Sequence, residues 1–151
     1  MYGRILVPVD GSDTSLRGLE EAIRLARQLN ASVRLIHVLD EPALVMGEVS
    51  AGNAAYESEA RRSAGNAVLS DGMARARRAS VDVDGVLVES IGGPAGKYIV
   101  ENATECQADL IVCGTHGRSG IRRVLMGSDA EYVVRHATVP VLLVRSHAGD
   151  A

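Results

Sequence analysis

The stretch from Ala108 to Val144 constrains the fold of this chain more than any other. It opens with the short apolar run Leu110–Cys113, which has the length and composition of a buried strand. A glycine-rich loop, Gly114–Gly127, follows, and apolar residues then recur at helical spacing from Ser128 onward. A strand, a glycine loop and a helix N-terminus in this order present backbone N–H groups and the positive end of a helix dipole to an anion. This unit predicts a phosphate site.

The rest of the chain alternates apolar runs with segments of helical period. Residues 40–56 have no clear period, and we expect an irregular or partly helical excursion there. The helix predicted after this segment has one apolar face, formed by Ala60, Ala64, Ala67, Val68 and Met73. Gly65 and Gly72 weaken this helix prediction. The predicted strands are Ile5–Val9, Val33–Leu39, Val83–Glu89, Leu110–Cys113 and Val139–Val144, and the predicted helices are Asp13–Asn30, Glu57–Ala79, Pro94 to about Cys106, and Ser128–His136. This alternation predicts a doubly wound α/β fold with a parallel sheet covered by helices on both faces.

The helix predicted from Ser128 carries a second pattern at its start. Ser128-Asp129-Ala130-Glu131 has the spacing of a capping box, in which the serine hydroxyl binds the backbone at the helix N-terminus. A capping hydroxyl at that position would also face a bound phosphate. In the preceding loop, His116 and Arg118 could each contact a phosphate, although a solvated loop position is the alternative for both.

Four segments of the chain resemble the universal stress protein family in family order. Gly114-x2-Gly117-x9-Gly127-Ser128 is similar to the signature of its ATP-binding branch. The V-P-V-D-G-S opening, the I-H-V of the second strand and the V-P-V-L-L-V end match as well. The resemblance implies a five-stranded sheet in the order 3-2-1-4-5, the adenine nucleotide alpha hydrolase-like arrangement. Ligands of such sheets bind at the carboxyl ends of the strands, beside the reversal between strands one and four.

The family's nucleotide contacts can be carried onto this chain residue by residue. Val38 would hold adenine through its backbone, Asp10 would accept from a ribose or adenine group, and the glycines would leave room for phosphates. A plain turn or cap role is the alternative for Asp10, and plain turn glycines for the loop. Together with the loop residues His116 and Arg118 and with Asp129, the candidate site residues are Val9, Asp10, Val38, Gly114, His116, Gly117, Arg118, Gly127, Ser128 and Asp129.

Asp129 departs from the family pattern, in which a small apolar residue, commonly valine, often follows Gly-Ser. An aspartate in the first turn of a helix is favourable to the dipole, but beside a triphosphate it is a like charge. Because Mg²⁺ binds through carboxylates together with substrate phosphates, we expect ATP to bind here together with Mg²⁺.

Composition narrows the class of protein. The 151 residues predict one domain, 1–151, and the net charge of -3 gives no basic surface for nucleic acid or anionic lipid. No apolar run approaches the roughly 20 residues that span a bilayer, and the N-terminal segment lacks a signal-peptide pattern, so we expect a cytoplasmic protein. Cys106 and Cys113 fit neither a zinc site nor a disulfide framework, and we expect both to be reduced core residues.

The sequence predicts binding without fast turnover. The loop lacks the G-K-S/T end of a Walker A motif and the Rossmann fingerprint, and no nucleophile elbow is present. We therefore expect an ATP-binding stress-response regulator that acts on an unidentified downstream protein, and the resemblance implies a homodimer through Val139–Val144. The alternatives are a slow ATPase in the same site, a ligand such as AMP or a cyclic nucleotide, and a dimeric interaction module without nucleotide.

Overall fold

Five parallel strands form the centre of the molecule. The computed structural model describes residues 1–40, 51–115 and 126–145. Within them the strand order is β3-β2-β1-β4-β5, which confirms the predicted topology. The strands are β1 (Arg4–Pro8), β2 (Ser32–Leu39), β3 (Val83–Glu89), β4 (Leu110–Gly114) and β5 (Val141–Val144).

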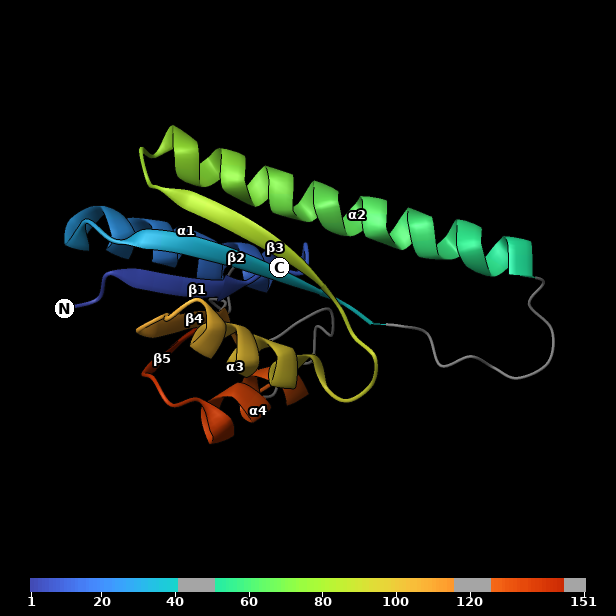
Figure 1. The fold of residues 1–151 in the computed structure, drawn as a ribbon. Helices are drawn as coiled ribbons and strands as arrows, with labels where there is room; N and C mark the ends of the chain where they lie inside the picture. The colour runs from blue at the N-terminus through green and yellow to red at the C-terminus, as the bar shows by residue number, and fades with distance from the viewer. Residues whose placement is uncertain (41–50, 116–125, 146–151) are drawn as a thin grey trace.

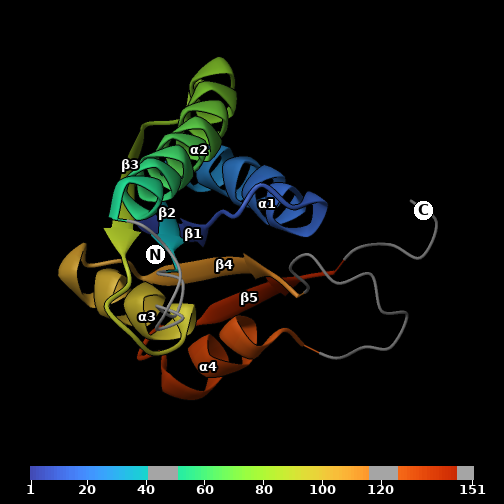
Figure 2. The ribbon, with the colours of Figure 1, turned by 90° about the vertical axis from the view of Figure 1, so that its right-hand side faces the viewer.

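Four helices cover the two faces of the sheet. Helices α1 and α2 lie on one face, and α3 and α4 lie side by side on the other (Figures 1 and 2). Their bounds are α1 (Asp13–Leu29), α2 (Ala51–Arg78), α3 (Ala95–Glu105) and α4 (Ser128–His136). No helix in the described ranges combines the length and apolarity that a membrane crossing needs.

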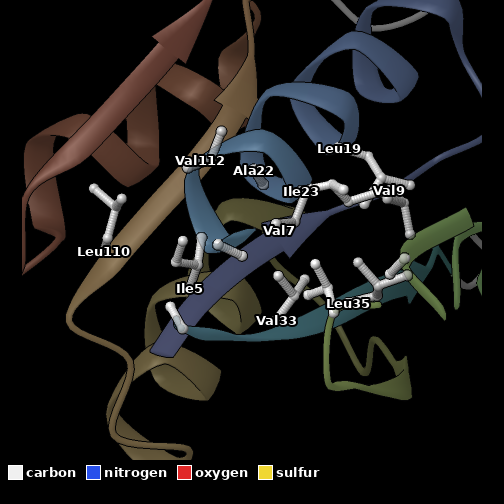
Figure 3. Packing of buried hydrophobic residues seen from close by; sticks show 14 of the residues in the cluster. Ile5, Val7, Val9, Leu19, Ala22, Ile23, Val33, Leu35, Leu110 and Val112 are labelled. Atoms are coloured by element: carbon white, nitrogen blue, oxygen red, sulfur yellow. The ribbon is translucent and has the colours of Figure 1, made fainter. Parts of the chain in front are cut away.

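The core is divided between the two faces because side chains alternate along each strand. Ile5 and Val7 of β1 point toward α1, where they pack with Leu19 and Leu35 (Figure 3). Leu6 points the other way, into a second cluster formed with residues of β2, β4, α3 and α4. Burial on both sides explains why Ile5–Val7 of β1 and Leu110–Cys113 of β4 are consecutive apolar residues.

Helix α2 differs from its prediction at its start and in the face that it buries. It begins at Ala51, before the predicted start at Glu57 and inside the segment predicted to be irregular or partly helical. Of the predicted face, the three alanines Ala60, Ala64 and Ala67 are exposed. Val68 and Met73 are partly buried and pack against the core. The buried positions are instead Gly65, Leu69, Gly72 and Ala76. The two glycines that lowered the helix propensity lie against the sheet, where the absence of a side chain lets the helix approach closely.

The ends of the other elements follow local backbone chemistry. Ser12 caps α1 by accepting a hydrogen bond from the Ser15 N–H over 3.2 Å. Asn30 ends the same helix in the left-handed region with φ 54°. Strand β5 begins at Val141 and not at Val139, because Pro140 has no N–H and contributes only its carbonyl, which accepts from the Ile111 N–H over 3.0 Å.

Candidate functional site

A cleft of about 600 Å³ opens at the carboxyl end of the sheet. The ends of β1, β2 and β4 form its floor, and the first turns of α1, α3 and α4 and one face of α2 form its walls. It therefore lies at the reversal of strand order between β1 and β4, the position at which open α/β sheets bind ligands. Its volume is in the range of small-molecule sites.

Seven of the ten predicted site residues line this cleft. They come from three strand ends and one helix start: Val9, Asp10, Val38, Gly114, Gly127, Ser128 and Asp129. The other three, His116, Gly117 and Arg118, lie outside the described residues. The fold thus brings together residues that are more than a hundred positions apart in the chain.

Asp10 is part of the turn that leads into α1. Its Oδ1 accepts from the Ser12 N–H over 2.8 Å, and its own N–H donates to the Ser15 hydroxyl over 3.1 Å. This is the turn role that the sequence left open as an alternative, and it fixes the carboxylate at the rim of the cleft.

Val38 offers backbone groups to the cleft. Strand β1 pairs with β2 only as far as Pro8 and Ile36, and the Val9 N–H donates to the Ile36 carbonyl over 2.9 Å. Because N–H and C=O groups of alternate residues point the same way, those of Val38 lie on the β1 side, beyond the end of the pairing. The Val38 side chain packs against the second core cluster. A donor and an acceptor side by side at a strand end suit the edge of a purine base.

The two described signature glycines do not need their special backbone freedom. Neither is among the glycines with positive φ, and Gly127 has φ -57° and ψ 152°. A positive φ therefore does not explain the glycines at Gly114 and Gly127. The Gly127 N–H donates to the Thr115 carbonyl over 2.8 Å, which fixes the backbone just before α4.

The predicted capping box at Ser128 is wrong. Gly127 is the N-cap of α4, and Ser128 is already the first helical residue, where its hydroxyl makes no capping hydrogen bond. The box is out of register because the Glu131 N–H donates to the Gly127 carbonyl, over 2.9 Å, and the Glu131 carboxylate pairs with Arg135. The N–H groups of residues 128–130 have no acceptor within the helix. Because all three residues line the cleft, these donors form an anion-binding end.

Asp129 binds a neighbouring helix. Its Oδ1 accepts from the Gly96 N–H in the first turn of α3 over 3.1 Å. Asp129 lines the cleft, but part of the hydrogen-bonding capacity of its carboxylate is already used.

His37 and Arg61 are among the cleft residues that sequence reasoning missed. The His37 Nδ1 lies 2.7 Å from the Val9 carbonyl, and since a carbonyl only accepts, Nδ1 carries the proton. Arg61 of α2 donates from Nη1 to the Asp40 carbonyl over 3.1 Å. The spacing of Arg61, Gly65 and Val68 along α2 was the available signal, but it requires knowing which face of the helix meets the sheet.

The described residues give no sign of a metal or disulfide centre. No group of three or more histidine, cysteine, aspartate or glutamate side chains in the described ranges could hold a metal ion. Cys113 is buried, and burial raises the pKa of its thiol to about 11. Cys106 is free and half-buried, and so less enclosed than predicted.

Comparison with known proteins identifies the family. The profile of the universal stress protein family matches residues 1–145. The chain belongs to the universal stress protein family. It is 37% identical over 145 residues to universal stress protein MJ0531 of Methanocaldococcus jannaschii, with 96% of this chain and 83% of that protein covered.

Two solved structures of universal stress proteins contain adenine nucleotides. One, in complex with cAMP, is 30% identical to this chain with a TM-score of 0.67, and 95% of this chain and 97% of that chain are covered. The other, from Archaeoglobus fulgidus in complex with dAMP, is 27% identical with a TM-score of 0.64, and the coverages are 94% and 97%. Family membership and the observed strand order together establish the doubly wound fold that the sequence predicted.

Proposed function

We propose that this universal stress protein binds an adenine nucleotide in the cleft at the carboxyl end of its sheet. The observation that carries the proposal is the open N-terminus of α4 facing the cleft, opposite the free backbone edge of Val38. An anion-binding end and a base-binding end in one cleft fit a nucleotide. Two structural relatives in complex with cAMP and dAMP support the choice of adenine.

The residues of the cleft divide into three groups under this proposal. The Val38 backbone binds the adenine edge, and Asp10 accepts from the ribose. The N–H groups of residues 128–130 bind phosphate oxygens. Gly127 leaves space beside them, and His116, Gly117 and Arg118 are proposed to complete the phosphate end from the loop. ATP with Mg²⁺ is the ligand that the sequence signature favours, and AMP or a cyclic nucleotide fits the same groups.

Identification of the nucleotide carried by freshly purified protein tests this proposal. Acid denaturation followed by chromatography should release an adenine nucleotide, and calorimetry should give tighter binding for adenine than for guanine nucleotides. Gly127→Val should lower the affinity at least tenfold without loss of fold, because φ -57° is open to any residue. Protein that releases no nucleotide and binds none at millimolar concentration would contradict the proposal.

We propose further that the nucleotide is a regulatory ligand and not a rapidly turned-over substrate. Efficient phosphoryl transfer needs a group that orients the nucleophile for in-line attack, and the sequence contains no motif that supplies one. A stoichiometric burst of ADP without sustained release is the expected result with ATP. Steady turnover would favour the alternative, a slow ATPase.

We also propose that two copies of this chain form a homodimer through β5. Strand β5 is the last strand in the sheet order, and its residues Val141–Val144 are all apolar and only partly buried. An apolar strand at the edge of a sheet is a template for pairing with another chain. A second copy of this strand related by a two-fold axis would cover it, and the downstream protein would then recognise the nucleotide state of the dimer.

A further inference from the structure

The carboxylate of Asp129 serves two helices. Helix α3 begins after Pro94, an N-cap that makes no side-chain hydrogen bond of its own. The Asp129 Oδ1 of α4 caps α3 instead, by accepting a hydrogen bond from the Gly96 N–H over 3.1 Å. Asp129 also lies in the first turn of α4, so its charge stands at the positive ends of two helix dipoles at once.

Gly96 is the residue that makes this contact possible. A Cβ at this position would stand 2.7 Å from the Tyr132 Cβ and 2.9 Å from the Asp129 carbonyl oxygen. Any side chain would therefore push the two helices apart at their N-terminal ends (Figure 2). Close backbone packing thus brings the start of α3 to the Asp129 carboxylate, which remains exposed to solvent.

The position of this charge matters because the same turn of α4 presents the anion-binding N–H groups. Among the described residues that line the cleft, three are aspartates, Asp10, Asp40 and Asp129, and one is an arginine, Arg61. Asp129 is the only one of these aspartates that lies on α4. A phosphate bound at the helix N-terminus would meet a fixed like charge within the same helical turn.

We propose that Asp129 determines specificity by lowering the affinity of the cleft in proportion to the negative charge of the ligand's phosphate chain. This inference rests on the proposed nucleotide site and adds a preference within it. Without a divalent cation, the cleft binds adenosine mono- or cyclic phosphates in preference to ATP. Mg²⁺ neutralises much of the triphosphate charge and therefore reduces the difference in affinity between these monophosphates and ATP.

The test compares Asp129→Asn with the wild type. Asparagine has nearly the same shape and keeps an oxygen that can accept from the Gly96 N–H, so the variant removes only the charge. Glu131→Gln is the matched control, since it removes a charge from the next-but-one residue of the same helix. Glu131 is exposed, is not among the residues that line the cleft, and pairs with Arg135 over 2.8 Å.

Calorimetry at one ionic strength measures adenosine, AMP and ATP with EDTA, and ATP with Mg²⁺. We expect Asp129→Asn to tighten metal-free ATP roughly tenfold or more, AMP about threefold and adenosine not at all. The ATP difference should shrink when Mg²⁺ is present. Glu131→Gln should change each affinity by less than about twofold, and thermal unfolding should verify that both variants are folded.

The remaining outcomes distinguish failure of the proposed selectivity from failure of the nucleotide site. Equal changes for adenosine, AMP and ATP, or no change for any of them, would leave Asp129 as a helix cap and end the proposed selectivity, while nucleotide binding would stand. Failure of both wild type and Asp129→Asn to bind any of the ligands would overturn the nucleotide site itself and the selectivity with it. Binding of ATP by Asp129→Asn alone would support the proposal in its strongest form.

Discussion

Gly114 at the end of β4 lies directly against Thr14 in the first turn of α1. A Cβ on Gly114 would stand 2.5 Å from the Thr14 carbonyl oxygen and 2.7 Å from its Cγ2. Thr14 is buried, and the neighbouring turn also approaches β4, since a Cβ on Gly18 would stand 3.1 Å from the Gly114 nitrogen. The first glycine of the nucleotide signature is therefore required by the packing of a helix on the sheet.

Replacing Gly114 should consequently destabilise the fold whether or not a ligand is present. We expect Gly114→Ala to lower the free energy of unfolding by about 1–3 kcal/mol, the usual cost of overpacking. This corresponds to a fall in Tm of roughly 3–10 °C for a domain of this size. Gly3→Ala is the control, because a Cβ on this exposed glycine would meet only the Asp109 Oδ2 at 3.7 Å, an ordinary contact, and its Tm should stay close to the wild type. Circular dichroism decides the matter, and equal Tm values for both variants would refute the packing argument.

The sequence predicted what depends on local pattern. Apolar runs and helical periods identified all nine elements of the described ranges, and the resemblance supplied the strand order. The failures involve contacts between distant segments. Gly96 and Asp129 are 33 positions apart, so no spacing rule connects them. Gly65 was interpreted through helix propensity, whereas tertiary packing decides its role, and the capping box failed because the backbone enters α4 one residue earlier than the motif assumes.

Gly65 provides a test in which propensity and packing predict opposite signs. Alanine is about 1 kcal/mol better than glycine inside a helix. A Cβ at Gly65 would, however, stand 2.8 Å from the His37 Cδ2 and 2.9 Å from the Leu87 Cδ1. The His37 ring is held by its hydrogen bond to Val9 and cannot easily move away. We expect Gly65→Ala to destabilise by about 1–2 kcal/mol.

The neighbouring position supplies the control for that test. Asn66 is exposed on the same helix, so Asn66→Ala should follow propensity alone and stabilise by a few tenths of a kcal/mol. Urea unfolding of both variants measures the two signs. A Gly65→Ala protein that is more stable than the wild type would show that α2 does not pack against His37 as described.

The Cys113 thiol makes stability depend on pH in the alkaline range. Burial raises its pKa to about 11 from an ordinary value of 9.0. The folded chain therefore keeps this proton at a pH where the unfolded chain releases it. The stabilisation is complete below about pH 9 and is lost as pH rises toward 11, and it amounts to about 2–3 kcal/mol.

Cys113→Val removes this titration while keeping a small apolar side chain in the core. We expect the difference in unfolding free energy between wild type and variant to shift in favour of the variant between pH 8 and pH 10.5. Iodoacetamide at pH 8 should label the half-buried Cys106 well before Cys113. Parallel stability curves for the two proteins across this range would mean that the Cys113 thiol ionises normally in the fold.

The open edge of β5 allows a backbone test of the proposed dimer. The carbonyl of Pro140 accepts from the Ile111 N–H of β4, and that of Val144 accepts from the Thr115 N–H just after β4, each over 3.0 Å. Alternation along the strand then directs the N–H of Leu143 away from β4.

Leu143→Pro should remove a donor that a partner strand needs without breaking a hydrogen bond to β4, and should therefore give a folded monomer. Leu143→Ala keeps the N–H and should remain dimeric. Sedimentation at tens of micromolar measures both, and a monomeric wild type would rule out the dimer.

Arg61 should contribute to binding at the base end of the cleft. Its guanidinium donates to the carbonyl of Asp40, two residues beyond Val38, and a planar cation at that point can stack on a purine. We expect Arg61→Met, which keeps an apolar stem of similar length, to weaken adenosine and AMP by the same factor of roughly 3–30. An equal loss of affinity for adenosine and AMP distinguishes Arg61 from Asp129, whose effect grows with phosphate charge.

Arg62→Met is the matched control, since Arg62 pairs with Glu89 and is not among the residues that line the cleft. Both variants should melt near the wild-type temperature because neither side chain belongs to the core. Wild-type affinity in Arg61→Met would mean that this arginine only joins α2 to the end of β2, and a loss confined to AMP would instead move it to the phosphate end.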